Sequence, residues 1–189
     1  MLRTIALVLA ATLTVSAQVG QSFPHTNKYG RATYEYRHEG LTVVVNYDYS
    51  QTNHDGRWLL IDVALGSVNR FVLHRNDFTL VTPGGKTIPL ATQQQGEADA
   101  DQINLLIQNA KIHRKNLDSY FTQRARHEPI TFFSLPFSRT ISDEAIVDND
   151  RVAMGPLLFR TTSEEWQEGT HRLVLNNEKA KAELPIILQ

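Results

Sequence analysis

Residues 74–90 read HRNDFTLVTPGGKTIPL, a sequence that indicates a strand, a tight turn and a second strand. Phe78 and Leu80 are two positions apart and therefore lie on the same face of an extended chain. In TPGGKT, the proline fixes φ and the two glycines permit the reversal. The glycine pair lacks the glycine spacing, the Lys-Ser/Thr pair and the following helix of a phosphate-binding loop. The stretch therefore predicts a scaffold hairpin, and HRND predicts a kink or bulge before it.

Segments with strand-like composition lie on both sides of this hairpin. Those upstream are RATYEYRH (31–38), LTVVVNYDYS (41–50) and RWLLIDVALGS (57–67), of which the last is apolar enough for a central strand. Those downstream are PITFFSLPF (129–137), VAMGPLLFRTT (152–162), RLVL (172–175) and AELPIILQ (182–189). Turn signals such as Glu39-Gly40 separate them, and Pro185 predicts an edge position for the last segment. About nine short antiparallel strands are typical of a β-sandwich or barrel.

One segment, residues 97–125, breaks the β pattern. Its apolar residues recur at helical spacing, at Ile103, Leu106, Ile107, Ala110, Leu117 and Phe121. Acidic residues gather at its start and basic residues toward its end, which complements a helix dipole. The sequence predicts one α-helix inserted into the β fold. We expect its apolar stripe to pack against the protein's own sheets, with Leu106 and Leu117 facing them; contact with a partner protein is the alternative.

The first residues, MLRTIALVLAATLTVSAQ, have the pattern of an export signal. Arg3 supplies a positive charge, and residues 5–14 are apolar but too short to span a bilayer. Small residues precede the expected cleavage site between Ala17 and Gln18. Residues 1–17 are therefore predicted to be a signal peptide, with a buried N-terminal strand or helix as the alternative.

The rest of the chain has the composition of a single exported domain. Residues 18–30 are polar and predict a flexible lead-in, and residues 31–189 predict one domain. The net charge of −1 for the full sequence, or about −2 without Arg3, gives no reason to expect nucleic acid as a partner. The chain has no cysteine, which excludes disulfides. No other apolar run is long enough to span a membrane, so we expect a periplasmic or secreted protein without an integral membrane segment after signal removal.

Two stretches share a pattern of strand, glycine turn and late Trp-Gly strand. They are RNDFTLVTPGGKTIPL (75–90) and LLFRTTSEEWQEGTHRLVL (157–175). The positions that carry the pattern are Phe78, Leu80, Gly85, Phe159, Trp166, Gly169, Leu173 and Leu175. With these residues, the region 41–188 resembles exported bacterial immunoglobulin-like domains of unknown function. The resemblance implies an immunoglobulin-like β-sandwich and supplies no catalytic residues, while the missing cysteine pair and the inserted helix depart from antibody-type domains.

The search for catalytic residues leaves no strong candidate. No serine lies in a Gly-x-Ser-x-Gly turn, and no histidines have His-Glu-x-x-His spacing. His113 and His127 lie in a basic region and are expected at the surface. His38 and His171 lie at strand edges, and their convergence on one pocket would favour an enzyme.

The acidic residues 143–150 are the best candidate for a binding site. We expect them to form a loop in which Asp148, Asn149 and Asp150 present oxygen ligands of the kind that calcium prefers. The loop lacks the register of an EF-hand, and a solvated turn explains the same residues, so we predict no metal site. Trp166 is a second binding candidate because an indole ring stacks on sugars, with packing in the core as the alternative.

These observations predict a mainly β, immunoglobulin-like sandwich with one inserted helix at about residues 97–125. The expected function is a non-enzymatic binding or assembly module of the bacterial envelope, without cofactor. A protein partner is expected to contact an edge strand or the helix. The alternative is a small periplasmic enzyme or metal-binding protein that uses histidine and aspartate residues.

Overall fold

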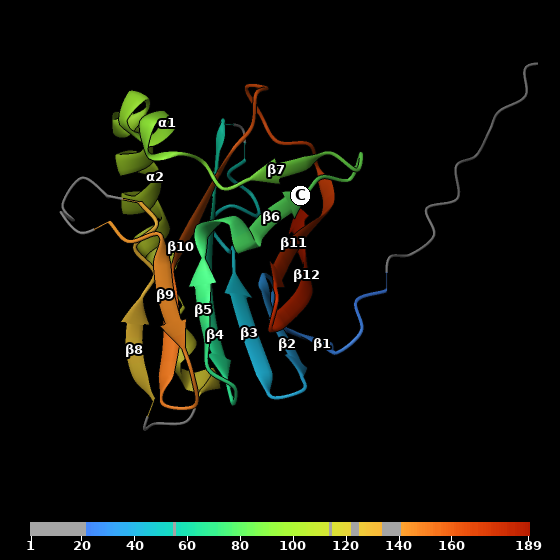
Figure 1. The fold of residues 1–189 in the computed structure, drawn as a ribbon. Helices are drawn as coiled ribbons and strands as arrows, with labels where there is room; N and C mark the ends of the chain where they lie inside the picture. The colour runs from blue at the N-terminus through green and yellow to red at the C-terminus, as the bar shows by residue number, and fades with distance from the viewer. Residues whose placement is uncertain (1–21, 55, 114, 122–124, 134–140) are drawn as a thin grey trace, which may run out of the picture.

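The computed structural model describes residues 22–54, 56–113, 115–121, 125–133 and 141–189. These residues form a mainly β structure in which two sheets face each other, with a two-stranded ribbon and two α-helices beside them (Figure 1). The mainly β composition agrees with the prediction from the sequence. The signal peptide predicted at residues 1–17 lies outside the described residues.

The larger sheet has six strands in the order β1-β2-β3-β4-β10-β8. They are β1 (Thr26–Tyr29), β2 (Thr33–His38), β3 (Leu41–Asn46), β4 (Trp58–Ser67), β10 (Arg151–Arg160) and β8 (Arg126–Pro129). β4 lies between β3 and β10 and is buried along nearly its whole length, as its apolar sequence predicts for a central strand. Neighbouring strands are antiparallel, except that β8 and β10 run parallel.

The smaller sheet has four strands in the order β12-β11-β6-β7. They are β12 (Ala180–Leu188), β11 (Gly169–Asn177), β6 (Phe78–Val81) and β7 (Thr87–Pro89). The predicted hairpin is formed by β6 and β7, and Gly85 in its turn has a φ of 82°, which a side chain would strain. β12 lies at the edge of the sheet, as Pro185 predicts, because proline has no N–H for a second neighbouring strand.

The main core lies between the two sheets. Val43 and Val45 of β3 are fully buried, and they share one apolar cluster with Phe78, Leu173 and Leu184 of the smaller sheet. Burying each side chain of this size stabilises the fold by roughly 1.5–3 kcal/mol. The opposite face of the larger sheet carries a second, smaller cluster around Val44, Ala64, Leu117 and Val152.

A short ribbon joins β5 (Phe71–His74) to β9 (Glu144–Val147). The kink predicted for HRND is η1 (Arg75–Asp77), one turn of 3-10 helix between β5 and β6. The Asp77 carboxylate accepts a hydrogen bond of 2.7 Å from the His74 N–H and so holds this turn.

The prediction of a loop over the whole of residues 143–150 is wrong, because its centre forms β9. Ala145 and Val147 are buried while Glu144 is exposed, which is the alternation of a strand with one face in the core. The alternation is too short to stand out among the flanking acidic residues in the sequence.

The prediction of one helix at residues 97–125 is also wrong in its bounds. The structure has α1 (Gln93–Ala98) and α2 (Ala100–His113), followed by η2 (Leu117–Tyr120), a turn of 3-10 helix. Thr92 and Gln95 form a capping box, which starts the helical region earlier. The Asn116 side chain accepts a 2.9 Å hydrogen bond from the Asp118 N–H, so a new turn begins there.

The helices are docked on the protein's own sheets, as expected. Ile103 and Ala110 of α2 are buried in the main core, and Leu106 is partly buried against it. The Asp99 carboxylate, between α1 and α2, accepts hydrogen bonds from Trp58 Nε1 at 3.0 Å and Arg160 Nε at 3.1 Å. Both donors belong to the larger sheet, so these bonds fix the helical region to it.

Two further segments differ from the sequence-based expectation. Part of the predicted lead-in, Thr26–Tyr29, forms β1 and pairs with β2. Of the strand expected at 129–137, only Pro129 belongs to a strand; Ile130–Phe133 lack strand structure, and the remainder lies outside the described residues. Within the described part of the chain, no helix has the length and apolar character needed to cross a membrane.

Candidate functional site

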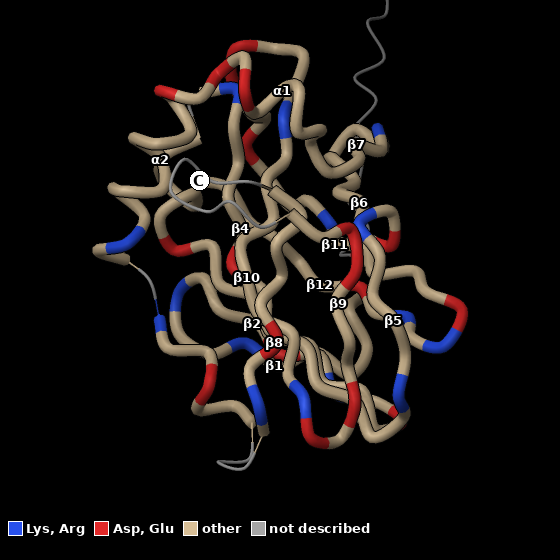
Figure 2. The backbone as a smooth tube through the Cα atoms, turned by 60° about the vertical axis from the view of Figure 1, so that its left-hand side comes forward, with Lys and Arg blue, Asp and Glu red and all other residues tan. Residues whose placement is uncertain are grey.

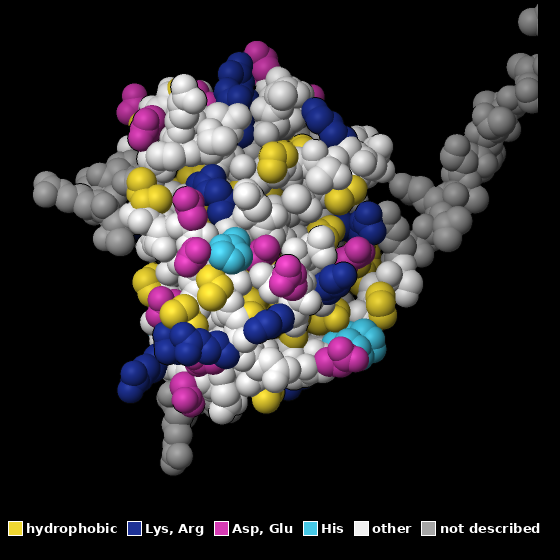
Figure 3. Space-filling view, in the orientation of Figure 1, with side chains coloured by type: hydrophobic (Ala, Val, Ile, Leu, Met, Phe, Trp, Pro, Cys, Tyr) yellow, Lys and Arg dark blue, Asp and Glu magenta, His cyan; other side chains and the backbone are white. Residues whose placement is uncertain are grey.

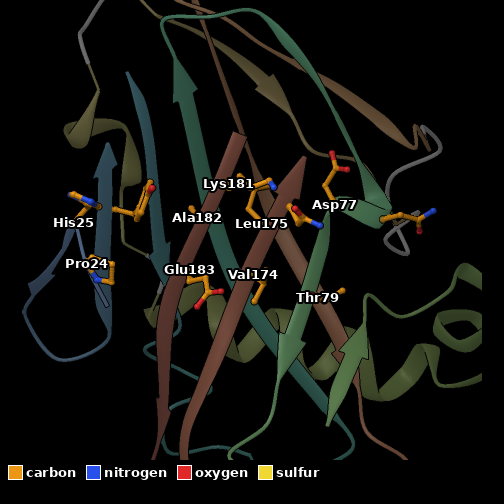
Figure 4. A pocket seen from close by; sticks show the side chains of 12 residues that line it. Pro24, His25, Asp77, Thr79, Val174, Leu175, Lys181, Ala182 and Glu183 are labelled. Carbon is orange, nitrogen blue, oxygen red and sulfur yellow. The ribbon is translucent and has the colours of Figure 1, made fainter. Parts of the chain in front are cut away.

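A groove with a volume of ≈ 460 Å³ lies over β12, β11 and β6 (Figure 4). The chain before β1 forms one wall and η1 forms the opposite wall. Its polar lining residues are His25, Asn76, Asp77, Thr79, Asn176, Lys181 and Glu183. The volume lies in the range of about 300–1,000 Å³ that is usual for small-ligand sites.

Strand register sets the floor of the groove. Thr79, Val174 and Glu183 are paired across β6, β11 and β12 and therefore form one row. Asn176 is opposite Lys181 and lies two positions along β11 from Val174, so this pair forms the next row on the same face. The residues between these positions point into the core. Because side chains alternate along a strand, the polar residues of these strands face the groove.

The N-terminal wall contacts β2. His25 has a φ of 61°, a left-handed conformation that is unfavourable for a residue with a side chain. Its carbonyl accepts a 2.9 Å hydrogen bond from the Arg37 N–H, and its ring stacks on His38 with 3.8 Å between the ring centres. These contacts place the imidazole at the rim of the groove.

The opposite wall presents a carboxylate that is only partly used. Asp77 Oδ2 accepts hydrogen bonds from the His74 N–H at 2.7 Å and from Asn177 Nδ2 at 2.8 Å. Within the described part of the chain, Asp77 Oδ1 has no such partner. The neighbouring Asn76 is exposed.

Several polar side chains of the floor and of the η1 wall have no partner within the described part of the protein. Among the described residues, the side chains of Asn76, Thr79, Asn176 and Lys181 have no hydrogen bond or ion pair. Glu183 Oε2 pairs with Arg172 Nη1 at 2.9 Å, which leaves its other oxygen open. The groove therefore offers hydrogen-bond donors and acceptors side by side.

The charges around the groove are balanced. The Asp77 and Glu183 carboxylates are matched by Lys181 and by Arg172, the partner of Glu183. Figure 3 shows acidic and basic side chains interleaved with hydrophobic ones on the face that carries β5, β11 and β12. Figure 2 shows basic and acidic positions interspersed along the described backbone. This pattern does not favour a polyanionic ligand.

The predicted acidic candidates lie in the turn between β9 and β10. Asp148 Oδ1 accepts a 3.0 Å hydrogen bond from the Asp150 N–H, and Asp148 Oδ2 pairs with Arg151 Nε at 3.3 Å. Asp150 and Asn149 are exposed. This geometry is that of a hydrogen-bonded Asx turn, in which Asp148 is engaged by its own neighbours.

The other predicted candidate, Trp166, lies in the core. Its side chain is 4 % exposed, and its indole N–H donates to the Arg57 carbonyl at 3.2 Å. Its ring meets the ring of His171 with 5.9 Å between the centres. In this arrangement the indole ring has no open face on which a sugar could stack.

The structure does not unite His38 and His171 in one site. His38 lies at the hairpin between β2 and β3 and stacks on His25, whereas His171 is buried near the start of β11, toward the other end of the sheets (Figure 1). A different pair, His127 and Asp118, meets with 3.3 Å between Nε2 and Oδ1. In the described ranges, no group of three His, Asp or Glu side chains is arranged to hold a metal ion.

Sequence reasoning did not single out the residues of the groove. The only signal was the alternation of polar and apolar residues in FTLV, RLVLNN and AKAELP. Alternation predicts which residues face outward but not which strands are neighbours, and the groove depends on that pairing. No family model matches this chain, and no curated protein matches it in sequence.

Proposed function

We propose that this protein is a non-enzymatic binding module of the bacterial envelope and that the groove over β12, β11 and β6 holds its ligand. One observation carries the proposal. Uncommitted polar side chains from η1, β6, β11 and β12 converge on a single groove of ligand-binding size. Polar side chains at a surface are usually scattered and contact water or a neighbouring side chain. Several of them gathered around one groove support the binding of a ligand there.

The location in the envelope belongs to the same proposal. It is supported by the signal-like sequence MLRTIALVLAATLTVSAQ and by the absence of cysteine. N-terminal sequencing of the protein recovered from the periplasm of an exporting bacterium is expected to start at Gln18. A cytosolic protein that starts at Met1 would contradict this part of the proposal.

We also propose that the fold is an immunoglobulin-like sandwich with the helices inserted. Two facing, largely antiparallel sheets and the edge position of β12 support this assignment. The parallel pairing of β8 with β10 is a departure that the proposal treats as part of the insertion. A crystal structure with Greek-key connections between the two sheets would support it, and a different connectivity would overturn it.

Site-specific photo-crosslinking tests the binding role and does not require that the ligand be identified beforehand. A photoreactive amino acid replaces Lys181 in the groove or, as the control, the exposed Lys111 on α2. In intact exporting cells we expect an adduct from position 181 and none from position 111. Equal adducts from both positions, or none from either, would contradict a ligand site in the groove.

A second candidate function is hydrolysis by a histidine–aspartate pair. The pair of His127 and Asp118 lines a cavity of ≈ 390 Å³ that also contains the nearly buried Asp62. A histidine oriented by a carboxylate is a general base. Hydrolysis of a panel of activated esters that is lost in His127→Ala and kept in His74→Ala would favour this function over binding.

A further inference from the structure

We infer that the ligand of this groove is a short, uncharged oligosaccharide, an inference that rests on the proposed binding function. Three features support it: the hydrogen-bonding side chains that the groove leaves without partners, the balance of charges around the groove, and the partly blocked edge of β12.

The first step concerns the edge of the smaller sheet. Asn177 and Ala180 flank a two-residue turn, so the hydrogen-bonded pairs of the hairpin alternate from there. The backbone groups of Lys181, Glu183 and Pro185 therefore point away from β11, toward the free edge. An extended peptide that adds a strand would need these groups.

This edge is blocked at several points against a further strand. The Glu183 carbonyl accepts a 3.5 Å hydrogen bond from Thr26 Oγ1, and Pro185 has no N–H to donate. Beyond β12, the Gln189 N–H already donates to the Gln51 carbonyl at 2.9 Å. The groove itself lies over the face of the sheet, where side chains line it, so we expect recognition there to use side chains and not an added peptide strand.

The second step concerns the side chains that remain open. The carboxamides of Asn76 and Asn176 each donate and accept, the hydroxyl of Thr79 does both, and Lys181 donates. Asp77 and Glu183 each retain one carboxylate oxygen as an acceptor. A sugar hydroxyl also donates and accepts, so adjacent hydroxyls of a sugar ring match this mixture better than a ligand with one kind of group.

Charge and apolar surface agree with this ligand. The two carboxylates are balanced by Lys181 and Arg172, so a strongly charged ligand would meet repulsion as well as attraction. Pro24 and Val174 also line the groove and present apolar surface between the polar groups. The C–H faces of sugar rings can cover such surface while the hydroxyls at the ring edges are bound.

Binding of defined small probes to the full chain tests the inference. Maltotriose, cellotriose and chitotriose serve as uncharged saccharides, and trialanine and tripolyphosphate serve as peptide and polyanion probes. We expect at least one saccharide to bind and to shift the amide NMR signals of Asn176 and Lys181, and neither of the other probes to do so.

Two groove variants and one matched control complete the test. Asn176→Ala and Thr79→Val should each weaken saccharide binding by about tenfold, the effect of losing one or two hydrogen bonds. Lys179→Ala lies in the adjacent turn, outside the groove, and should leave the affinity unchanged. Melting temperatures of all three variants must match the parent, so that a loss of affinity is not a loss of folding.

The outcomes separate the ligand class from the binding function. No saccharide binding, or binding that the groove variants do not weaken, overturns the inference. Trialanine or tripolyphosphate bound at Asn176 overturns the saccharide class. Crosslinked adducts at position 181 and not at position 111 in cells would keep the binding function in either case, whereas equal adducts at both positions, or none at either, would overturn the binding function itself.

Discussion

His171 is a titratable side chain buried in the core. It has no exposed surface, and neither ring nitrogen reaches a hydrogen-bond partner among the described residues. Burial lowers the pKa of its imidazole to about 4 from an ordinary value of 6.5; the Gly169 backbone opposes part of this shift, and the nearby His54 adds to it. The imidazole is therefore neutral in the folded protein at pH 7, and charging it would place a cation in the core without a counter-charge.

Stability is expected to fall as the medium is acidified. Because the pKa of His171 is lower in the folded protein than in the unfolded chain, the unfolded chain binds more protons between pH 6.5 and about 4. The stability that the neutral His171 imidazole provides is fully present above pH 6.5 and is lost progressively as the pH falls to about 4. The loss from this residue approaches about 3 kcal/mol in the free energy of unfolding, which urea titrations across this pH range measure.

Replacement of His171 by phenylalanine isolates its contribution to the loss of stability in acid. His171→Phe keeps the ring and removes both unpartnered nitrogens, so its stability should equal or exceed the parent's at pH 7 and should fall less between pH 6.5 and 4. An unchanged pH profile in His171→Phe would show that other groups carry the acid sensitivity.

The acidic turn between β9 and β10 gives a second prediction for single residues. Because the Asp148 carboxylate is engaged by Arg151 and by the Asp150 N–H, calcium would have to break these contacts before it could bind. We expect the melting temperature in millimolar calcium to equal that in EDTA. Native-state binding would raise it by mass action, so a calcium-dependent increase of several degrees that Asp148→Asn removes would contradict the prediction.

At the scale of elements, α2 shows how one helix face stabilises the fold. Ile103 is 4 % exposed and belongs to the main core, whereas Leu105 is 60 % exposed on another face of the same helix. Ile103→Asp should lower the free energy of unfolding by about 3–5 kcal/mol, because it buries an unpaired charge. Leu105→Asp is the matched control and should change it by less than about 0.5 kcal/mol. Chemical denaturation measures both.

The same comparison tests whether α2 is a recognition element. If Ile103→Asp left stability unchanged and Leu105→Asp lost a binding partner, the helix would serve recognition and not packing. The exposed Ile112 lies seven positions from Leu105 and therefore near the same face of α2. If that face binds a partner, a double variant at both sites should weaken binding more than Leu105→Asp alone.

Elements were predicted correctly from the sequence where the pattern that specifies them lies within a few neighbouring residues. The hairpin of β6 and β7 was predictable because its alternation and its glycine turn lie within a few residues of each other. The helix was predicted too long because periodicity alone cannot register that the Asn116 side chain competes for a backbone N–H. The groove was not predictable, because β6 and β11 are neighbours only through long-range pairing.

At the scale of the whole molecule, one arginine connects segments that are distant in the sequence. Arg75 of η1 donates hydrogen bonds to the carbonyls of Ala91 and Phe132, and its Nε pairs with Asp143 Oδ1 at 3.5 Å. Its guanidinium carbon also lies 4.5 Å from the centre of the Phe133 ring. The side chain is 17 % exposed, so these bonds are largely shielded from water.

Replacement of Arg75 should therefore destabilise the molecule as a unit. Arg75→Met keeps the length of the side chain but leaves the two carbonyls without their donor, and we expect the free energy of unfolding to fall by about 2–4 kcal/mol. Arg75→Lys should recover only part of this loss, because an ammonium group cannot match the planar fork of a guanidinium that reaches two carbonyls at once. Arg70→Lys changes an exposed arginine nearby and should have little effect. Urea denaturation gives the three values. If Arg75→Lys were as stable as the parent, charge alone would explain the role of Arg75, and the geometry of its hydrogen bonds would not matter.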